Sequence, residues 1–555
     1  MRSLTEAPIG STARSGTFKV LGAIFLLALV LRLLWMFVLV DSANNEGIYY
    51  LRVAENLLAG KGYIGLRENG LQILYPPLFP YLIAGLTAII GNAEWAARVI
   101  NILVGSALIL PVFLIGKQLA NRQVGILAAA LVAIHPFMIA MATVILSETI
   151  YMFLVMNGLF AVIRAAKTGS IWCSVLAGFC FGLAYLARPE GLLFAVIAGV
   201  GLGVIYLRKP LSAISTGGLL LVTTVVIIAP YIVWLSDVAG EFLLESKSAD
   251  NYATKSQLMA HVPPAEIFCG LNDDLTGKGS SIISNLDEIK KWHLPTVKAA
   301  KFALSTAPFS VPSTIWHLTM KRIMGNPVFI LLVALGFVSG VRRRESWTVH
   351  CVLLIAVGAT FLALLLAPTQ MFQERYVFPC LAPMAVWCAE GLLVLGEWVN
   401  KKAGVGSDSR WPGRTVIVLG LIGMIIIPLP VVRSVPDFQQ GWGDNHLSKT
   451  LGYWFLKHSS VPHPRIMDIN DPALAYYASG VLEPFPYAPA GKALAYIDRR
   501  KIDYLVLPSH PDSARPYVAD WKQNGIPGGH AKLIYEVPDP KGGEVQVYQW
   551  NNPAG

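Results

Sequence analysis

The sequence predicts a polytopic α-helical membrane protein with about 11–13 transmembrane helices, followed by a small α/β domain. The chain has 555 residues, of which 54% are hydrophobic and only 14% are charged, and its mean hydropathy is +0.55. A soluble domain usually carries about 25% charged residues, so this composition requires surroundings less polar than water. Apolar stretches of roughly 17–25 residues, the length that a membrane helix needs, recur over the first four-fifths of the chain.

The first apolar run, residues 18–40, is predicted to be an uncleaved membrane span. It is too long for the apolar core of a signal peptide, and no small-x-small cleavage motif follows it. Residues 1–17 then form a cytoplasmic amino-terminal segment. Arg32 lies within the span, where a charge is costly unless it faces the protein interior or reaches the membrane surface. We favour structural pairing over a catalytic role for this residue.

The remaining predicted spans lie between short clusters of basic residues. They are residues 94–117, 123–142, 145–164, 171–187, 191–207, 213–235, 326–341, 347–367, 376–396 and 414–432. The segment 75–91 is apolar but short and begins with prolines. The sequence leaves open whether this segment is a short span or a re-entrant piece.

The net charge of +10 invites a nucleic-acid-binding interpretation, but the basic residues do not gather into one patch. They lie at span ends: Lys117 and Arg122, Arg164 and Lys167, Arg208 and Lys209, Arg342 to Arg344, and Lys401 and Lys402 with Arg410 and Arg414. This is the positive-inside pattern of cytoplasmic loops. We therefore predict a multi-pass protein of the inner (plasma) membrane, surrounded by membrane lipids and without a nucleic-acid partner. The six cysteines, five of them in or near apolar spans, indicate no disulfide framework.

Three stretches are predicted on the opposite, extracytoplasmic side: the loops 41–75 and 236–325, and residues 433–555. Residues 18–432 then form the transmembrane domain. The last stretch has mixed charge and contains three runs typical of strands, "IDYLVLP", "KLIYEV" and "EVQVYQW". It is predicted to be a small extracytoplasmic α/β domain.

A short amphipathic helix is predicted directly after the first span, within "DSANNEGIYYLRVAENLLAGKGY", residues 41–63. Asn44 or Asn45 is a good N-cap and Gly60 a natural stop, and a helix this short would lie in the membrane interface. Glu46 falls in its first turn, where the helix dipole favours an ionised carboxylate. A base held at the membrane boundary suits proton abstraction from an acceptor. Stabilisation of the helix start is the alternative role, and local physics slightly favours it.

Other polar residues are predicted at the same level, where ionisable groups are default functional candidates. They are Glu148 at the start of a span, Arg188 and Glu190 in the turn of "LARPEGLL", Arg375 and Tyr376 in "ERYVFP", and Arg98 at the opening of the span after the proline-rich piece. Each ionisable group alone could equally pair with a neighbour or cap a helix. Together they predict a polar pocket that opens to the extracytoplasmic side.

The chemistry of such a pocket follows from its guanidinium groups, which match phosphate oxygens and stay charged when partly buried. A phosphate at the membrane boundary is most naturally the head group of a lipid. Displacement of that phosphate by an acceptor hydroxyl or amine would use arginines for the leaving group and Glu46 for the acceptor proton. The scattered histidines, including His135, are interpreted as structural, and neither a metal site nor a cofactor is predicted.

Six motifs in order resemble those of the GT-C glycosyltransferases, in particular the protein O-mannosyltransferase and lipid A aminoarabinose transferase group. They are "NEGIYYLRVAENLLAGKGY", "YPPLFPYL", "AARVINILVGSALILPVFLIGKQL", "HPF…LSETIY", "GLAYLARPEGLL" and "ERYVFPCLAP". The resemblance covers about residues 18–400. It implies a GT-C fold, a polyprenyl-phosphate-linked sugar as co-substrate, an extracytoplasmic active site and inversion at the anomeric carbon.

The resemblance also implies roles for individual residues. Glu46 becomes the catalytic base, although Asn45 stands where the family usually has a first acid. The residues expected to bind the donor phosphate are Arg375, Tyr376, Arg188 and Arg98. The residues expected to line the substrate pocket are Tyr49, Tyr50, Tyr75, Pro76, Pro77, Glu148 and Glu190. Tyr75 stands where related enzymes carry a phosphate-binding lysine, so that contact must come from elsewhere.

The favoured function is therefore transfer of a sugar from a polyprenyl-phosphate donor to a glycan, lipid or protein acceptor. The outer domain would then take part in acceptor selection. A membrane transporter or lipid flippase is the first alternative, but transporters often contain internal repeats, and no second copy of the Glu46 or Pro76–Pro77 segments is present. A non-catalytic scaffold whose outer domain binds a partner is the second alternative.

Overall fold

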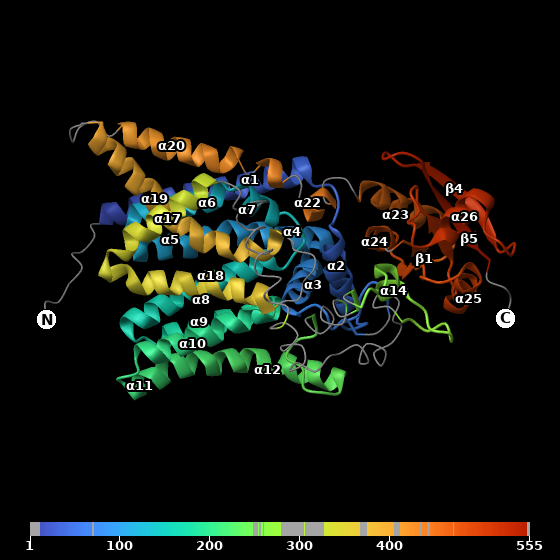
Figure 1. Cartoon of the computed structure of the whole chain (residues 1–555), viewed down its shortest axis with the longest axis horizontal. Coiled ribbons are helices and arrows are strands. Elements are labelled where there is room, and N and C mark those ends of the chain that lie inside the picture. Colours follow the sequence, from blue (N-terminus) through green and yellow to red (C-terminus); the bar gives the residue numbers. More distant parts are fainter. Residues whose placement is uncertain are drawn as a thin grey trace.

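The computed structural model describes residues 11–68, 71–247, 254, 257–258, 260–278, 305, 327–366, 374–403, 411–427, 429–432, 436–440, 445–469 and 471–551. These residues form an elongated bundle of helices and a smaller α/β domain beyond one end of it (Figure 1). The first described helix begins at the opposite end of the bundle (Figure 1). Arg410 and most of the predicted loop 236–325 fall outside the described residues.

The bundle is built from apolar helices joined mostly by short turns. Its elements are α1 (Ser11–Leu39), α3 (Leu78–Ile90), α4 (Ala93–Ala107), α5 (Ile109–Leu119), α6 (Arg122–Ile134), α7 (Pro136–Met141), α8 (Glu148–Thr168), α9 (Ile171–Ala187), α10 (Gly191–Ile205), α11 (Pro210–Ala213), η1 (Ile214–Gly218), α12 (Leu219–Ala239), α17 (Pro327–Val341), η3 (Arg344–Ser346), α18 (Trp347–Leu366), η4 (Glu374–Val377), α19 (Phe378–Lys402), α20 (Trp411–Ile426) and α21 (Leu429–Val432). In the described part of the chain, six helical stretches are long and apolar enough to cross a membrane, and six shorter apolar helices accompany them. The predicted polytopic α-helical class is confirmed.

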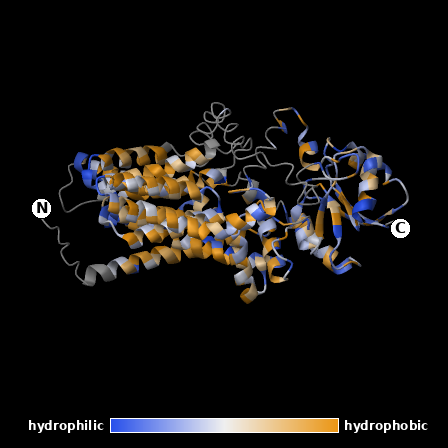
Figure 2. Cartoon of the chain, turned by 90° about the horizontal axis from the view of Figure 1, so that it is seen from below, coloured by the Kyte–Doolittle hydropathy of each residue, from blue (hydrophilic) through white to orange (hydrophobic). Residues whose placement is uncertain are grey.

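The outer surface of the bundle is apolar. Figure 2 shows hydrophobic residues along the bundle helices and a mixture of hydrophobic and hydrophilic residues in the α/β domain. Large side chains such as Phe18, Ile89 and Trp172 are 75%, 82% and 77% exposed. Contiguous apolar surface of this kind is unfavourable in water and favourable against lipid tails. The surface of the bundle is therefore suited to a bilayer.

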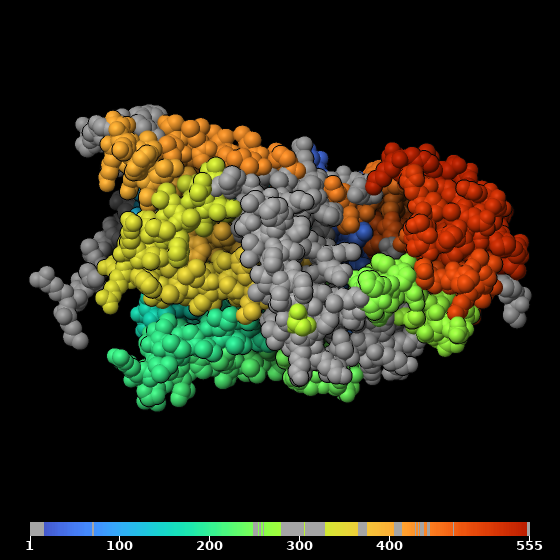
Figure 3. Space-filling model, viewed as in Figure 1, coloured from blue at the N-terminus to red at the C-terminus, as the bar shows by residue number. Residues whose placement is uncertain are grey.

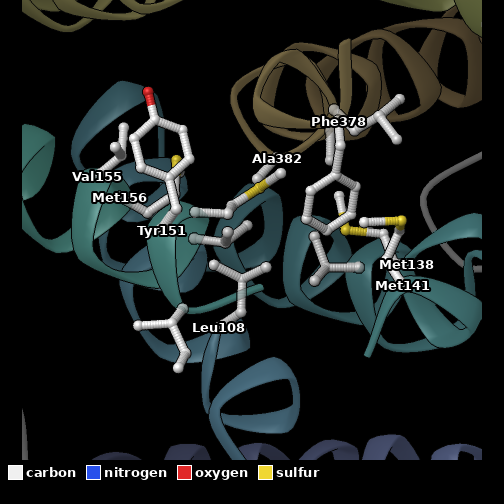
Figure 4. Close-up of a cluster of buried hydrophobic side chains, with 14 of the residues drawn as sticks. Leu108, Met138, Met141, Tyr151, Val155, Met156, Phe378 and Ala382 are labelled. Carbon is white, nitrogen blue, oxygen red and sulfur yellow. The ribbon is translucent and has the colours of Figure 1, made fainter. Parts of the chain in front are cut away.

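The bundle core is closely packed. Figure 4 shows part of it, where side chains from α7, α8 and α19 lie against the α4–α5 junction. The labelled residues are Leu108, Met138, Met141, Tyr151, Val155, Met156, Phe378 and Ala382. On the other side of α19, Gly391 and Gly336 allow α19 and α17 to approach so closely that a Cβ at Gly391 would overlap the backbone of Leu332.

One predicted span, residues 123–142, is wrong as a single helix. The chain breaks at His135, which has an extended backbone with φ −66° and ψ 120°, because the residue before a proline is forced away from the helical conformation. Pro136 also lacks the N–H that would bond the carbonyl of Val132. Arg32 supplies donors there instead: its guanidinium lies 3.4 Å from the oxygen of Val132 and 3.3 Å from that of Ala133. The prediction that Arg32 is paired structurally is confirmed.

The carboxy-terminal domain contains a five-stranded mixed sheet of order β2-β1-β3-β5-β4. Its elements are α22 (Pro436–Gln439), α23 (His446–His458), β1 (Arg465–Asp468), α24 (Pro472–Tyr477), β2 (Val481–Pro484), α25 (Ala490–Arg500), β3 (Tyr504–Leu507), α26 (Pro516–Asn524), β4 (Ala531–Pro538) and β5 (Glu544–Trp550). The three strands predicted from the sequence are β3, β4 and β5. Strands β1 and β2 were not predicted because their residues, RIMD and VLEP, lack the run of Val, Ile and Tyr that is typical of the other three.

Part of the long loop after α12 belongs to this domain. Helix α14 (Pro264–Cys269) lies against it (Figure 3). The backbone N–H of Tyr487 donates to the carbonyl of Cys269 over 2.7 Å. All six cysteines are free thiols. The domain therefore combines the carboxy-terminal residues with a segment that is distant in the sequence.

We expect Gly391→Ala to destabilise the bundle by about 1–3 kcal/mol, because the added methyl group forces α17 and α19 apart. Gly358→Ala in α18 is the matched control, since nothing lies within 4 Å of its Cβ position. Denaturant unfolding of both variants in detergent micelles would measure the difference. Equal stabilities of the two variants would contradict the described packing of α17 on α19.

Candidate active site

The first structural element after the first span is α2 (Asn45–Leu58), which places Glu46 in its first turn. The helix ends just before Gly60, which has a positive φ of 74°, as the sequence predicts. Asn44 is the N-cap by position, but its side chain does not cap α2. Its Oδ1 instead accepts a hydrogen bond from the backbone N–H of Ile145, 3.1 Å away. Most of α2 is buried against α3, α4 and α24 rather than lying free in an interface.

Glu46 is paired with an arginine from a distant part of the chain. The guanidinium of Arg375, in the turn η4 before α19, lies 2.5 Å from Glu46 Oε2. Its Nε is also 3.8 Å from Oε1 of Glu148, the first residue of α8. One short turn and the starts of two helices therefore meet at one point, and the expected proximity of Glu46 and Arg375 is confirmed.

Two further residues predicted for the site extend this network. Arg188 follows α9, and its guanidinium contacts Glu148 at 2.6 Å and Glu190 at 3.1 Å. Lys247, which the sequence analysis did not identify, lies 3.7 Å from Glu46 Oε1 and 6.0 Å from the ring centroid of Tyr75. We refer to these six side chains as the charge cluster: Glu46, Glu148, Arg188, Glu190, Lys247 and Arg375.

The charge cluster is deeply buried at one side and accessible at the other. The side chain of Glu148 is 1% exposed and that of Arg375 is 7% exposed. The side chains of Glu190 and Lys247 are 36% and 33% exposed. Lys247 and Glu190 are therefore the members of the charge cluster that solvent reaches most easily.

The cations keep the Glu46 carboxylate ionised. Burial raises the pKa of Glu46, but the positive charges of Arg375, Lys247 and Arg188 outweigh burial and lower the pKa to about 2. Glu46 is thus a carboxylate at any physiological pH. Its ability to accept a proton depends on how strongly the neighbouring cations hold it.

Aromatic residues line one side of the cluster, as expected for a substrate pocket. The rings of Tyr49 and Tyr50 lie 6.0 and 4.8 Å from that of Tyr75. The hydroxyl of Tyr63 donates to the carbonyl oxygens of Tyr75 and Pro76, which fixes the proline turn before α3. Pro77 occupies the N-cap position of α3. The segment 75–91, whose structure the sequence left undecided, is therefore this turn followed by a helix of 13 residues.

Arg98 is not part of the charge cluster. Its guanidinium donates to the carbonyl oxygens of Ser42 and Thr143 and pairs with Glu94 at 2.6 Å. These contacts join the loop after α1 to the segment before α8, so the structure does not bring Arg98 together with the other arginines predicted for the site. Tyr376 does lie beside the cluster, with the Arg375 guanidinium 5.5 Å from its ring centroid.

Lys247 was not predicted because it lies in the long loop after α12, in a stretch without a motif. No local signal marks it, and only the folded chain shows that it reaches Glu46. Among the described residues, no group of three or more His, Cys, Asp or Glu side chains is arranged to hold a metal ion.

Comparison with known proteins agrees with this architecture. Residues 75–234 match the dolichyl-phosphate-mannose-protein mannosyltransferase family, and no curated protein matches the chain. One similar structure is the oligosaccharyltransferase AglB from Archaeoglobus fulgidus in complex with an inhibitory peptide and a dolichol-phosphate. It is 14% identical, with a TM-score of 0.54 over 98% of this chain and 75% of that chain.

A second similar structure is ArnT from Cupriavidus metallidurans bound to undecaprenyl phosphate. It is 11% identical, with a TM-score of 0.53 over 98% of this chain and 99% of that chain. At these identities the structural likeness shows the fold, which is that of the GT-C glycosyltransferases. The chain is therefore similar to the GT-C glycosyltransferases in fold, and its residues 75–234 match a mannosyltransferase family in sequence.

We expect Glu148→Gln to lower the free energy of unfolding by about 3 kcal/mol, because it leaves the buried Arg188 guanidinium without its best-buried counter-charge. Glu190→Gln removes the more exposed partner of the same arginine and should cost less than about 1 kcal/mol. Unfolding of both variants in mixed micelles would measure the two costs. Similar costs for both variants would mean that Glu148 is not the main structural partner of Arg188.

Proposed function

We propose that the protein transfers a sugar from a polyprenyl-phosphate donor to an acceptor at the extracytoplasmic membrane face, with inversion at the anomeric carbon. The observation that carries the proposal is the contact between the Glu46 carboxylate and the Arg375 guanidinium inside the charge cluster. A base and a phosphate-binding cation lie within one side-chain length of each other, beside aromatic rings that suit a sugar or an isoprenoid. The binding of undecaprenyl phosphate by ArnT and of dolichol-phosphate by AglB supports this donor class.

The proposed reaction is a single displacement. The acceptor hydroxyl or amine loses its proton to Glu46 and attacks the anomeric carbon. The bond between that carbon and the phosphate oxygen breaks, and the electron pair leaves with the polyprenyl phosphate. Arg375 and Lys247 stabilise the additional negative charge on the phosphate, and one displacement inverts the configuration at the carbon.

The distribution of basic residues supports an extracytoplasmic site. Helix α8 begins at Glu148 in the charge cluster and ends near Lys167, and α19 begins beside Arg375 and ends at Lys401 and Lys402. The basic helix ends thus lie away from the charge cluster, and the positive-inside rule assigns them to the cytoplasm. The inner (plasma) membrane is the corresponding location.

We expect Glu46→Gln to reduce sugar transfer by about 10²- to 10⁴-fold, because it removes the base. Binding of undecaprenyl phosphate should be retained, since the cluster cations remain. Release of free lipid phosphate from polyprenyl-phosphate sugars would measure transfer. The matched control is Glu68→Gln, which changes an exposed carboxylate of the same loop that pairs with Lys61.

The outcomes of this experiment separate the alternatives. Unchanged transfer by Glu46→Gln would contradict the assignment of the base. No transfer by the wild-type protein with any polyprenyl-phosphate sugar would contradict the enzyme. Lipid translocation without a glycosylated product would indicate a transporter instead.

We expect Lys247→Met to move the acid limb of the pH profile of kcat/KM to higher pH. Lys247 is one of the charges that lower the pKa of Glu46, so its loss raises that pKa and protonates the base at a higher pH than in the wild type. Donor affinity should also fall by about 10-fold, the value of one charge-assisted contact. Lys61→Met, which removes an exposed lysine paired with Glu68, is the control, and an acid limb that stays in place in Lys247→Met would exclude this coupling.

A further inference from the structure

The loop between α1 and α2 is held by the carboxy-terminal part of the chain. The hydroxyl of Ser42 donates to the carbonyl of Gln440 over 3.0 Å, and the backbone N–H of Asn45 donates to Gln440 Oε1 over 3.1 Å. Gln440 directly follows α22, almost four hundred residues further along the chain. It contacts the residue immediately before Glu46.

Asn445 makes two more contacts with the same loop. Its side-chain amide donates to the carbonyl of Ala43 over 2.8 Å and to Oδ1 of Asn45 over 2.9 Å. Asn445 is buried, with an exposed fraction of 6%. A buried amide that bonds two sites on one loop fixes the position of that loop more strictly than a solvated one.

Tyr477, the last residue of α24, adds a third point of attachment. Its hydroxyl accepts a hydrogen bond from the backbone N–H of Ala43 over 2.9 Å and donates to Glu94 over 3.1 Å. Glu94 is in turn paired with Arg98, which donates to the carbonyl of Ser42. Arg98 therefore belongs to the set of contacts that holds the loop between α1 and α2.

The start of α2 needs these partners because it lacks a cap of its own. The first N–H groups of a helix have no partner within the helix, and an N-cap side chain normally accepts from one of them. The side chain of Asn44 is committed to Ile145 instead. Gln440 accepts from the N–H of Asn45, so the cap is supplied by the carboxy-terminal segment.

We propose that Gln440, Asn445 and Tyr477 are positioning residues that hold the start of α2 and thereby fix the Glu46 carboxylate against the reacting atoms. This inference rests on the proposed function, because it assigns a catalytic consequence to the contact between the two parts of the chain. A displacement of a catalytic group by about 1 Å can cost about 10²-fold in rate. Through these three residues the carboxy-terminal domain then contributes to the geometry of the catalytic site.

The test uses three variants of the full chain. Gln440→Met keeps the side-chain length and removes the acceptor, and Tyr477→Phe removes the hydroxyl that bonds Ala43 and Glu94. Gln440→Glu retains an acceptor at the same position and is the conservative replacement. Tyr517→Phe is the matched control, because its hydroxyl donates to Pro486 within the carboxy-terminal domain.

We expect kcat of Gln440→Met and Tyr477→Phe to fall by about 10- to 100-fold. The affinity for undecaprenyl phosphate should stay within about 2-fold of the wild type, because the charge cluster keeps its cations. Hydrogen exchange of the amides of residues 45–48 should become faster in both variants. Gln440→Glu should recover most of the lost kcat, and Tyr517→Phe should behave as the wild type.

The possible failures are distinguishable. Wild-type kcat in Gln440→Met and Tyr477→Phe would overturn the positioning role and leave the proposed function intact. An equal loss of kcat in Tyr517→Phe, or a loss matched by weaker lipid phosphate binding, would show a general structural effect and would also overturn it. Absence of transfer by the wild type would overturn the proposed function and this inference together.

Discussion

The arrangement of the bundle at the end that carries the charge cluster depends on the burial of the Glu46–Arg375 pair. Removing one charge from such a pair leaves the other uncompensated, which costs several kcal/mol. Three carboxylates and three cations meet in the charge cluster, so their charges balance. This balance requires α2, α8, the turn after α9, the loop after α12 and η4 to meet, and it explains why residues so distant in sequence share one site.

The same pair has a consequence for reactivity. While Arg375 contacts Glu46, it holds the carboxylate ionised and makes it a weak base. A phosphate that binds between Lys247 and Arg375 would compete with Glu46 for the guanidinium. Proton affinity at Glu46 would therefore rise only when the donor is in place. Under the proposed function, one interaction would both stabilise the charge cluster and link donor binding to activation of the base.

The sequence was sufficient to predict the parts of the molecule that follow from local rules. Apolar length predicts the spans, because a membrane helix must cross the hydrocarbon core. Runs rich in Val, Ile and Tyr predict strands β3 to β5, because these residues favour the extended backbone. The sequence could not distinguish the role of Arg188 from that of Arg98, since both lie near a helix end and were predicted at the same depth in the membrane. Arg188 joins the charge cluster and Arg98 bonds Ser42 and Glu94. Which partner an arginine finds is a tertiary property, and the same holds for Lys247.

The presence of an amide, Asn45, directly before Glu46 can be understood from the two networks that meet there. Asn45 Oδ1 accepts from Asn445, and its backbone N–H donates to Gln440. The next residue, Glu46, contacts Arg375 and Lys247. A second carboxylate beside Glu46 would add a negative charge to a cluster whose charges already balance, and would compete for its cations. A neutral amide keeps the attachment to the carboxy-terminal segment and leaves Glu46 as the acid that faces Arg375.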